Sequence, residues 1–301
     1  TVMKRLNMVY RHITGYEECV EALRCPGEEL SNRPPKLRSA EVCERHPGLV
    51  SHLRAWQLFS DGEHHMRFRV HVPSPLVQED QVEKLRAFTQ EAAHEALGLA
   101  VPVDAQVEHY VMRCIDRVFG LHAPLHLVHL VFSIMHSVDA RYDEATWRQA
   151  ETDYEEWSKF LAGVVHRHTQ LRSPAPDSKD EFDVSRHQLI PAMMRLYPAR
   201  DERDLIDTIS TFIIGGIHNP IIFIKGMVER GDQDVLRAAK DHPPAPVLVR
   251  TDVATGQGVV LNLQRANAQQ PEQDKMLSFG RGGRHACMGS LYAKAQAHIF
   301  I

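Results

Sequence analysis

The chain has 301 residues, 43% hydrophobic and 25% charged, which is enough to bury a sizeable core. Its net charge of −4 gives no electrostatic case for a nucleic-acid partner. Five scattered cysteines without a C-x-x-C pair argue against a disulfide framework or a four-thiolate zinc site, and they favour a reducing cytoplasm. Residues 1–11 are too polar for a signal peptide, and the longest apolar run, 209–217, is too short to cross a bilayer, so we expect no membrane partner.

Helical periodicity of apolar residues dominates the chain. Residues 81–97 place Val82, Leu85 and Phe88 on one face with charged residues opposite. Similar patterns predict helices over 107–119, 144–168 and 204–230, strands at 247–250 and 259–263, and loops over 172–183 and 267–275. We find no repeat and no linker, so we predict a single domain over 1–301 that is mainly α with a small β element.

The segment with the clearest chemistry is 277–289, where four glycines surround Cys287. Glycines let the backbone turn tightly and approach a flat ligand. Residues 290–301 are expected to form a helix, so Cys287 would lie just before a helix N-terminus, where the dipole favours a thiolate. A single thiolate beside Arg and His suits a haem iron and its propionates. Two alternatives stay open here: a buried structural cysteine, and a zinc site using His285 and Cys287, for which no second close pair supplies ligands.

The pattern Gly283-x-His285-x-Cys287-x-Gly289 resembles the haem-binding signature of bacterial cytochromes P-450. The resemblance implies haem b with Cys287 as axial iron ligand, and places Gly283, Gly289 and Phe279 in the cofactor-binding loop. The family's Phe lies seven residues before its Cys, whereas Phe279 lies eight before Cys287, as if one residue had been inserted.

Further segments follow in the order of that family. The stretch from His65 to Arg69 resembles its H-x-R-x-R motif, and two residues four apart on a helix can grip one carboxylate. Taken alone, this stretch also fits a basic turn on a surface helix. Arg250 occupies the place of a strand Arg, and 266–271 is similar to the A-N-R-D-P segment. The resemblance implies that His65, Arg69, Arg250 and His285 surround the haem propionates.

Residues 213–220 fall where the family's central helix carries its A-G-x-[DE]-T motif. Aligning Gly216 with the motif's Gly puts His218 at the acid and Asn219 at the alcohol, and we take these three as the catalytic candidates. His can move a proton near neutral pH, whereas Asn can only hydrogen-bond. Pro220 has no N–H for the carbonyl of Gly216, which predicts a break and a groove. The alternative is a Pro kink with His218 packed in the core.

The chain also departs from the family pattern. The E-x-x-R motif between the central helix and the Cys segment is absent, and its letters at 21–24 and 83–86 lie in the wrong part of the chain. Only 232–247 is left for that region, so we expect the helix to be deleted. The chain is a shortened and divergent relative, and fold alone does not fix its activity.

The resemblance implies a cytoplasmic, atypical haem-dependent oxidoreductase of monooxygenase or peroxygenase type. It would act on a small organic molecule in bacterial secondary metabolism, with electrons from ferredoxin and ferredoxin reductase or oxidant from peroxide. Two alternatives come from other classes: a haem-thiolate isomerase, dehydratase or bond-forming enzyme that needs no external electrons, and a catalytically silent haem- or ligand-binding relative. The substrate is not readable from the sequence.

Overall fold

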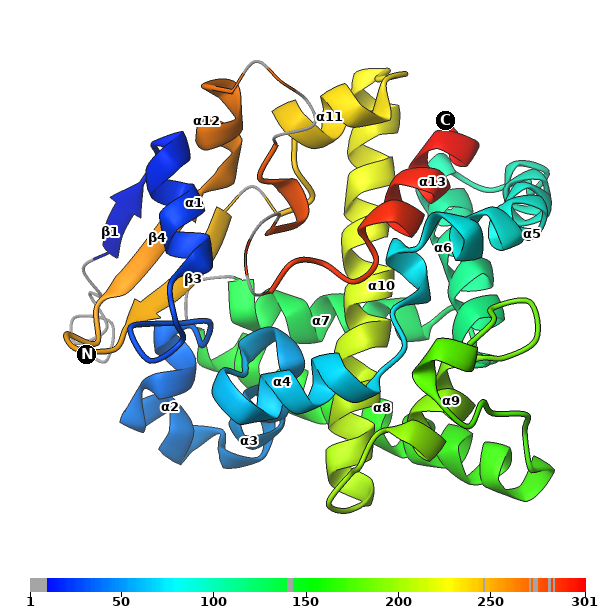
Figure 1. Ribbon diagram of the computed structural model, residues 1–301, viewed down its shortest axis with the longest axis horizontal. Coiled ribbons are helices and arrows are strands. Elements are labelled where there is room, and N and C mark those ends of the chain that lie inside the picture. The colour runs from blue at the N-terminus through cyan, green and yellow to red at the C-terminus, as the bar shows by residue number, and fades with distance from the viewer. Residues whose placement is uncertain are drawn as a thin grey trace. The chain divides into compact units, whose positions relative to one another are not determined.

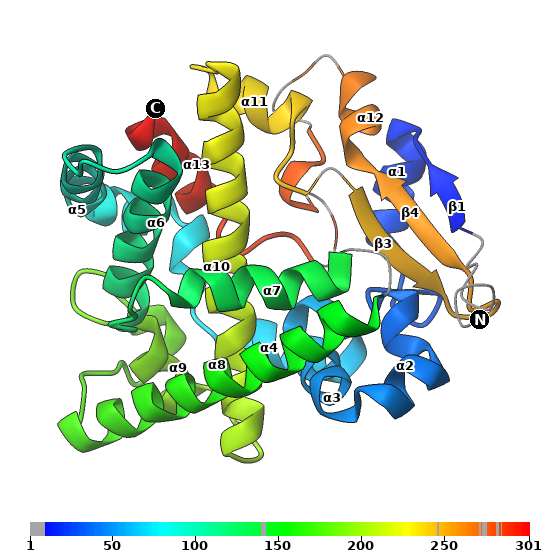
Figure 2. The ribbon, with the colours of Figure 1, turned by 180° about the vertical axis from the view of Figure 1, so that it is seen from behind.

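The computed structural model, drawn in Figures 1 and 2, describes residues 10–139, 143–245, 247–270, 272, 276–280, 283 and 285–301. It divides into two compact units, which are described one at a time. Unit 1 comprises Thr1–Met66 and Leu236–Cys287, and unit 2 comprises Arg67–Val235 and Met288–Ile301. The single haem-binding domain over 1–301 stays a prediction.

Unit 1 combines a small sheet with short helices. Its elements are β1 (Tyr10–Ile13), α1 (Tyr16–Arg24), β2 (Leu30–Ser31), η2 (Pro35–Arg38), α2 (Ala40–Arg45), α3 (Pro47–Ala55), η3 (Gln57–Phe59), β3 (Val247–Asp252), β4 (Gly258–Asn262), α12 (Leu263–Ala268) and η7 (Ser278–Gly280). Two helices, α4 (Gly62–His71) and α11 (Val235–Asp241), cross its boundary with unit 2. The strand order is β1-β4-β3-β2, with β1 and β4 parallel and the other pairs antiparallel.

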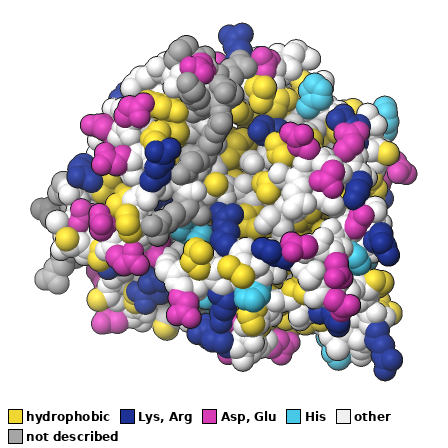
Figure 3. All heavy atoms as spheres, viewed as in Figure 1, with side chains coloured by type: hydrophobic (Ala, Val, Ile, Leu, Met, Phe, Trp, Pro, Cys, Tyr) yellow, Lys and Arg dark blue, Asp and Glu magenta, His cyan; other side chains and the backbone are white. Residues whose placement is uncertain are grey.

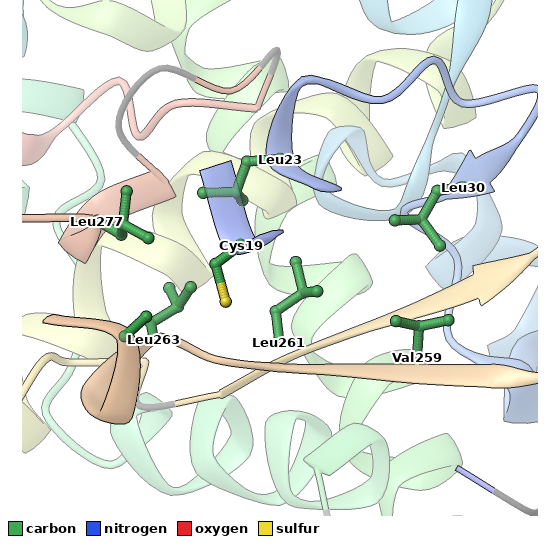
Figure 4. Close-up of a cluster of buried hydrophobic side chains, with 8 residues drawn as sticks. Cys19, Leu23, Leu30, Val259, Leu261, Leu263 and Leu277 are labelled. Atoms are coloured by element: carbon green, nitrogen blue, oxygen red, sulfur yellow. The ribbon is translucent and has the colours of Figure 1, made fainter. Parts of the chain in front are cut away.

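A cluster of buried side chains holds α1 against the sheet (Figure 4). Cys19 and Leu23 lie four apart on α1 and share a face, and they meet Val259 and Leu261, which lie two apart on β4. Leu277 belongs to the same cluster and is 2% exposed. Each such Leu contributes roughly 1.5–3 kcal/mol on burial, so the start of the Cys segment is fixed to the core of unit 1.

The secondary-structure elements described in unit 2 are all helices. Its elements are η4 (Pro75–Val77), α5 (Glu79–Leu97), α6 (Val103–Phe119), α7 (Leu127–Asp139), α8 (Glu144–Leu171), η5 (Lys179–Glu181), α9 (Leu189–Leu196), α10 (Glu202–Arg230) and α13 (Ser290–Phe300). Helix α10 packs against α6, α7, α8, α9 and α13, and Figure 2 shows α7 crossing it. It is therefore the central helix of this unit.

The ends of α10 follow from local sequence. The Asp201 side chain caps the helix by accepting a hydrogen bond from the N–H of Asp204, and Gly231 ends it with a φ of 67°. The helix continues through Pro220, so the predicted break does not interrupt it. It is also long and apolar enough to cross a membrane, but half of its apolar window is buried, as in the core helix of a globular protein.

The predicted class, mainly α with a small β element, is confirmed. Helices predicted from periodicity are present as α5, α6, α8, α10 and α13, and the two predicted strands as β3 and β4. The predicted loop over 267–275 is wrong at its start, because Asn267 and Ala268 complete α12. The predicted deletion is also incomplete: the seven-residue α11 lies between α10 and β3, without an E-x-x-R pattern.

Charged side chains of both signs are scattered over the face drawn in Figure 3. Lys and Arg side chains are interspersed with Asp and Glu on that face, as expected for a chain with 35 basic and 39 acidic residues. Charge on this face is therefore distributed between the two signs rather than gathered into one field.

Candidate functional site

The Cys segment, residues 277–289, turns back sharply after it leaves the core of unit 1. Phe279 and Gly280 have φ values of 64° and 65°, and the N–H of Gly280 donates to the carbonyl of Leu277 at 3.0 Å. The N–H of Cys287 donates to the carbonyl of Phe279 at 2.8 Å. A left-handed Phe costs about 1–2 kcal/mol, so this turn is held by its surroundings. The turn lies where this sequence has one residue more between Phe279 and Cys287 than the cytochrome P-450 signature. Arg281, Gly282 and Arg284 lie outside the described residues.

Gly283 fixes the Cys segment to α1. A Cβ on Gly283 would lie 2.8 Å from the backbone oxygen of Leu23, so any side chain would push the segment away from the helix. No such restriction acts at Gly289, whose added Cβ would meet nothing within 4 Å. Gly289 is the N-cap residue of α13 and provides no side-chain cap. Cys287 therefore comes three residues before the first residue of α13, near the backbone N–H groups that a helix start leaves without partners inside the helix.

Cys287 differs from the buried cysteines of the chain. Cys19 and Cys114 are 0% exposed, and burial raises the pKa of each thiol to about 11. Cys287 is exposed. The alternative of a buried structural cysteine is therefore wrong for Cys287, because its thiol can reach a ligand from outside the core. Among the described residues no three His, Cys, Asp or Glu side chains gather as a metal ion would require, so the zinc alternative gains no third ligand there.

A small pocket in unit 1 brings three of the predicted propionate ligands together. His65 of α4, Arg250 of β3 and His285 of the Cys segment all line it, together with Asp61. Its volume is about 50 Å³. One water needs roughly 10–15 Å³, so the pocket suits a carboxylate-sized group and not a whole cofactor.

The two histidines of the pocket are stacked. The ring centroids of His65 and His285 lie 3.7 Å apart with an interplanar angle of 28°. His285 Nε2 lies 3.8 Å from Asp61 Oδ1. His65 is 6% exposed, so its ring is part of the wall of the pocket rather than of a basic surface turn. Residues 220 positions apart in sequence thus form one wall.

Arg250 is the charged centre of the pocket. It is 9% exposed, and burial lowers its pKa to about 10, opposed by the negative charge of Asp61. The guanidinium is therefore protonated at neutral pH. Within the described ranges it makes no hydrogen bond and no ion pair closer than 4 Å. A buried charge without such partners is costly, and a bound carboxylate would relieve that cost. The residues present therefore fit a haem propionate.

Both arginines of α4, Arg67 and Arg69, belong to unit 2. Arg67 donates to Tyr197 Oη at 2.9 Å and to Asp204 Oδ2 at 3.0 Å, which ties α4 to the start of α10 within unit 2. The motif gave no signal for this structural role. Arg69 lies one helical turn after His65 on α4 but belongs to unit 2, and its contact with a propionate stays a prediction.

The segment predicted to be catalytic lies in the middle of α10. His218 is 8% exposed and packs against Phe132 of α7, with ring centroids 4.8 Å apart. Its Nδ1 lies 3.2 Å from Asn219 Oδ1, so the two candidate side chains are hydrogen-bonded to each other. Asn219 is partly exposed. The pair thus joins a buried imidazole to an amide that reaches the surface.

The two glycines of this segment have different surroundings. A Cβ on Gly216 would lie 2.9 Å from Cδ1 of Ile115, so Gly216 allows α6 to pack closely against α10. Gly215 is exposed, and an added Cβ there would meet nothing within 4 Å. Gly216 therefore has a packing role, whereas Gly215 has space beside it for a side chain. The motif alignment gave no sign of this difference between the two glycines.

Comparison with known proteins identifies the fold. No protein-family model matches the chain, and no curated protein matches it. Solved structures do: P450BioI in complex with an acyl carrier protein ligated to hexadec-9Z-enoic acid has 17% identity and a TM-score of 0.74, covering 99% of this chain and 87% of that one. Epothilone D-bound cytochrome P450epoK has 16% identity and a TM-score of 0.71, covering 99% and 85%. CxnD, a cytochrome P-450 for C–S bond formation in chuangxinmycin biosynthesis, has 17% identity and a TM-score of 0.65, covering 98% and 79%.

These likenesses show the fold of the cytochromes P-450. They extend over nearly all of this chain and leave parts of the longer structures unmatched. The predicted cytochrome P-450-like helical fold, reduced in size, is therefore confirmed. At such low identity the likeness carries the fold alone.

Proposed function

We propose that this chain is a haem-thiolate protein of cytochrome P-450 type that binds haem b with Cys287 as the axial iron ligand. The observation that carries the proposal is Arg250, a buried guanidinium facing a carboxylate-sized pocket beside the stacked rings of His65 and His285. The exposed Cys287 lies two residues after His285 in the same unit. The fold supports the same cofactor.

Each residue has a stated part in holding the cofactor. The Cys287 thiolate would bind the iron, and Arg250, His65, His285 and Arg69 would bind the propionates. Haem supplies redox or Lewis-acid chemistry at its iron when it is bound. The turn at Phe279 and the close approach at Gly283 would fix the position of the thiolate.

We propose oxidation of a small organic molecule as the leading reaction, of monooxygenase or peroxygenase type. Electrons would come from ferredoxin and ferredoxin reductase, or the oxidant from peroxide, in the cytoplasm of a bacterium. Solved structures of this fold include one with bound epothilone D and one from chuangxinmycin biosynthesis, which supports a place in secondary metabolism. His218 would hold or move a proton, and Asn219 would orient water or substrate through the hydrogen bond that joins them.

A second candidate is a haem-thiolate isomerase, dehydratase or bond-forming enzyme that needs no external electrons. The observation that favours it is the His218–Asn219 pair, which stands where the family pattern has an acid and an alcohol. CxnD, with the same fold, is described as forming a C–S bond. A catalytically silent haem-binding relative is the third candidate.

One set of assays separates these candidates. Turnover of candidate small molecules is measured with O2 plus ferredoxin and its reductase, with peroxide, and with neither. Product only in the first or second arm supports oxidation, and product in the third arm supports the electron-independent class. Haem uptake without product in any arm supports the silent relative. A protein that takes up no haem contradicts all three.

A further inference from the structure

Both side-chain oxygens of Asp61 accept hydrogen bonds from residues at or just after the end of β2. Its Oδ2 accepts from Ser31 Oγ at 2.7 Å, and its Oδ1 accepts from Asn32 Nδ2 at 2.8 Å. The backbone N–H of Asn32 lies 3.2 Å from both oxygens. These donors come from the end of β2 and the residue after it, so Asp61 joins that turn to the start of α4.

The same carboxylate also contributes charge to the pocket. Asp61 lines the pocket with Arg250, and its charge is the one that raises the pKa of Arg250 against the effect of burial. No ion pair closer than 4 Å joins the two among the described contacts. The pocket therefore presents the positive Arg250 and two carboxylates, Asp61 and the exposed Glu28, so a ligand that enters it meets charges of both signs.

We propose that Asp61 biases the pocket against anions in proportion to their charge, so that it lowers the affinity for a dianionic group such as phosphate more than the affinity for a single carboxylate. The proposal rests on the proposed haem site and goes beyond it by assigning charge selection to a residue outside the family motifs. Arg250 attracts an entering anion and Asp61 repels it, and both interactions double when the anion carries two charges. The repulsion that Asp61 alone contributes is therefore twice as large for a dianion as for a carboxylate. Asp61 thereby sets an upper limit on the affinity of the pocket for a propionate.

The substitution Asp61→Asn isolates this charge. Asn has the same shape as Asp, and one of its side-chain atoms becomes a donor that would face Asn32 Nδ2. Asn32 Oδ1 is buried and has no hydrogen-bond partner among the described residues. Rotation of the Asn32 amide by half a turn would present Oδ1 as the acceptor, so the contact between the two side chains is retained.

The experiment titrates wild-type and Asp61→Asn apoprotein with haem b and with haem dimethyl ester, whose propionates carry no charge, and follows the Soret band. Glu44→Gln, an exposed change on α2, is the matched control. Removing one repulsive charge at close range is expected to tighten haem b binding by about tenfold, with ester binding unchanged. Equal haem affinity in the two proteins overturns the proposal. Weaker binding of both ligands by Asp61→Asn also overturns it, because Asp61 would then only support the pocket.

Failure of the proposed function gives a different result. If wild-type and variant take up neither ligand, the haem site is refuted, and sodium propionate and inorganic phosphate then test the pocket itself through thermal stabilisation of the apoprotein. Asp61→Asn is expected to be stabilised more than wild type by both anions, and by phosphate the more strongly. If each anion stabilises wild type and Asp61→Asn equally, the proposed effect of Asp61 on anion binding is overturned as well.

Discussion

The pocket of unit 1 depends on charge, whereas the middle of α10 in unit 2 depends on packing. In the pocket, Arg250 is buried beside His65 and His285 and can accept an anion. In α10, Gly216 fits against Ile115, and the buried His218 is hydrogen-bonded to its own neighbour. The two regions therefore depend on different interactions, and a substitution in one need not affect the other.

The largest effect is expected from His218→Ala. If His218 moves a proton in turnover, its loss should lower kcat by roughly 10²–10⁴-fold, as is typical of lost acid–base catalysis, and leave the haem spectrum intact. His129→Ala, an exposed histidine on α7, is the control and should keep full activity. Steady-state turnover of any substrate found by the assays above is the measurement. Full activity of His218→Ala would make this residue a packed core histidine.

Arg250→Leu tests the charged pocket. A hydrogen bond to a charged group contributes about 1.5–3 kcal/mol, so haem affinity should fall by roughly 10- to 150-fold. The thermal midpoint of the apoprotein should not fall, because Leu removes a buried charge without a close partner. Arg69→Ala should also weaken haem retention without unfolding the chain. The exposed Arg237→Leu is the control. Unchanged haem affinity in Arg250→Leu would place the propionates elsewhere.

Gly215→Val and Gly216→Val form a matched pair within α10. Both introduce the same side chain with the same helix propensity, but only the one at 216 meets Ile115. Overpacking of this kind costs about 1–3 kcal/mol, so the free energy of unfolding should be lower for Gly216→Val than for Gly215→Val by that amount. Urea denaturation measures both. Equal stabilities would show that α6 shifts freely and that Gly216 has no packing role.

The smallest effect is a pH dependence from His168, at the end of α8. Its Nε2 lies 2.8 Å from the carbonyl oxygen of Gly120 and its Nδ1 lies 2.8 Å from Ser173 Oγ. Burial lowers the pKa of His168 below 6.5, the hydrogen bond to Gly120 opposes this, and the charges of Arg167 and His122 add to the lowering. The unfolded chain then binds a proton more readily than the folded one.

The stability that neutral His168 provides is therefore present above pH 6.5 and is lost as the pH falls through the unfolded and then the folded pKa. Urea unfolding of wild type should show this acid-side decline, and it should be smaller in His168→Gln. The exposed His166→Gln should retain the wild-type slope. An identical pH profile for His168→Gln and wild type would show that His168 does not cause the loss of stability at low pH.

The sequence predicted those elements that a repeating pattern of apolar residues or a group of glycines specifies. The periodicity of α5, α6, α8 and α10 reflects one buried face or a buried centre, and the glycines around Cys287 indicated a turn-rich loop. Strand β1 was missed, because its four residues lack alternation and become a strand only by pairing in parallel with β4. The two compact units have no signal in composition.

The same distinction applies to the candidate site. His65, Arg250 and His285 could be named from short motifs, and the structure brings them to one pocket. The place of Asp61 in the pocket could not be named in this way, because the residues around it come from β2, β3 and the Cys segment, and no spacing in the sequence joins these. An acidic residue four positions before His65 was the one signal that could have drawn attention to it.

The central claim is that Cys287 holds a haem iron as a thiolate, and the spectrum of the reduced protein with carbon monoxide tests it most directly. Purified wild-type protein should contain haem b and show the red-shifted Soret band of thiolate ligation. Cys287→Ala should lack that band, and Cys43→Ala, a partly exposed cysteine of the same unit that does not line the pocket, should retain it. A colourless wild-type protein that takes up no haem, or an unchanged band in Cys287→Ala, would contradict the account.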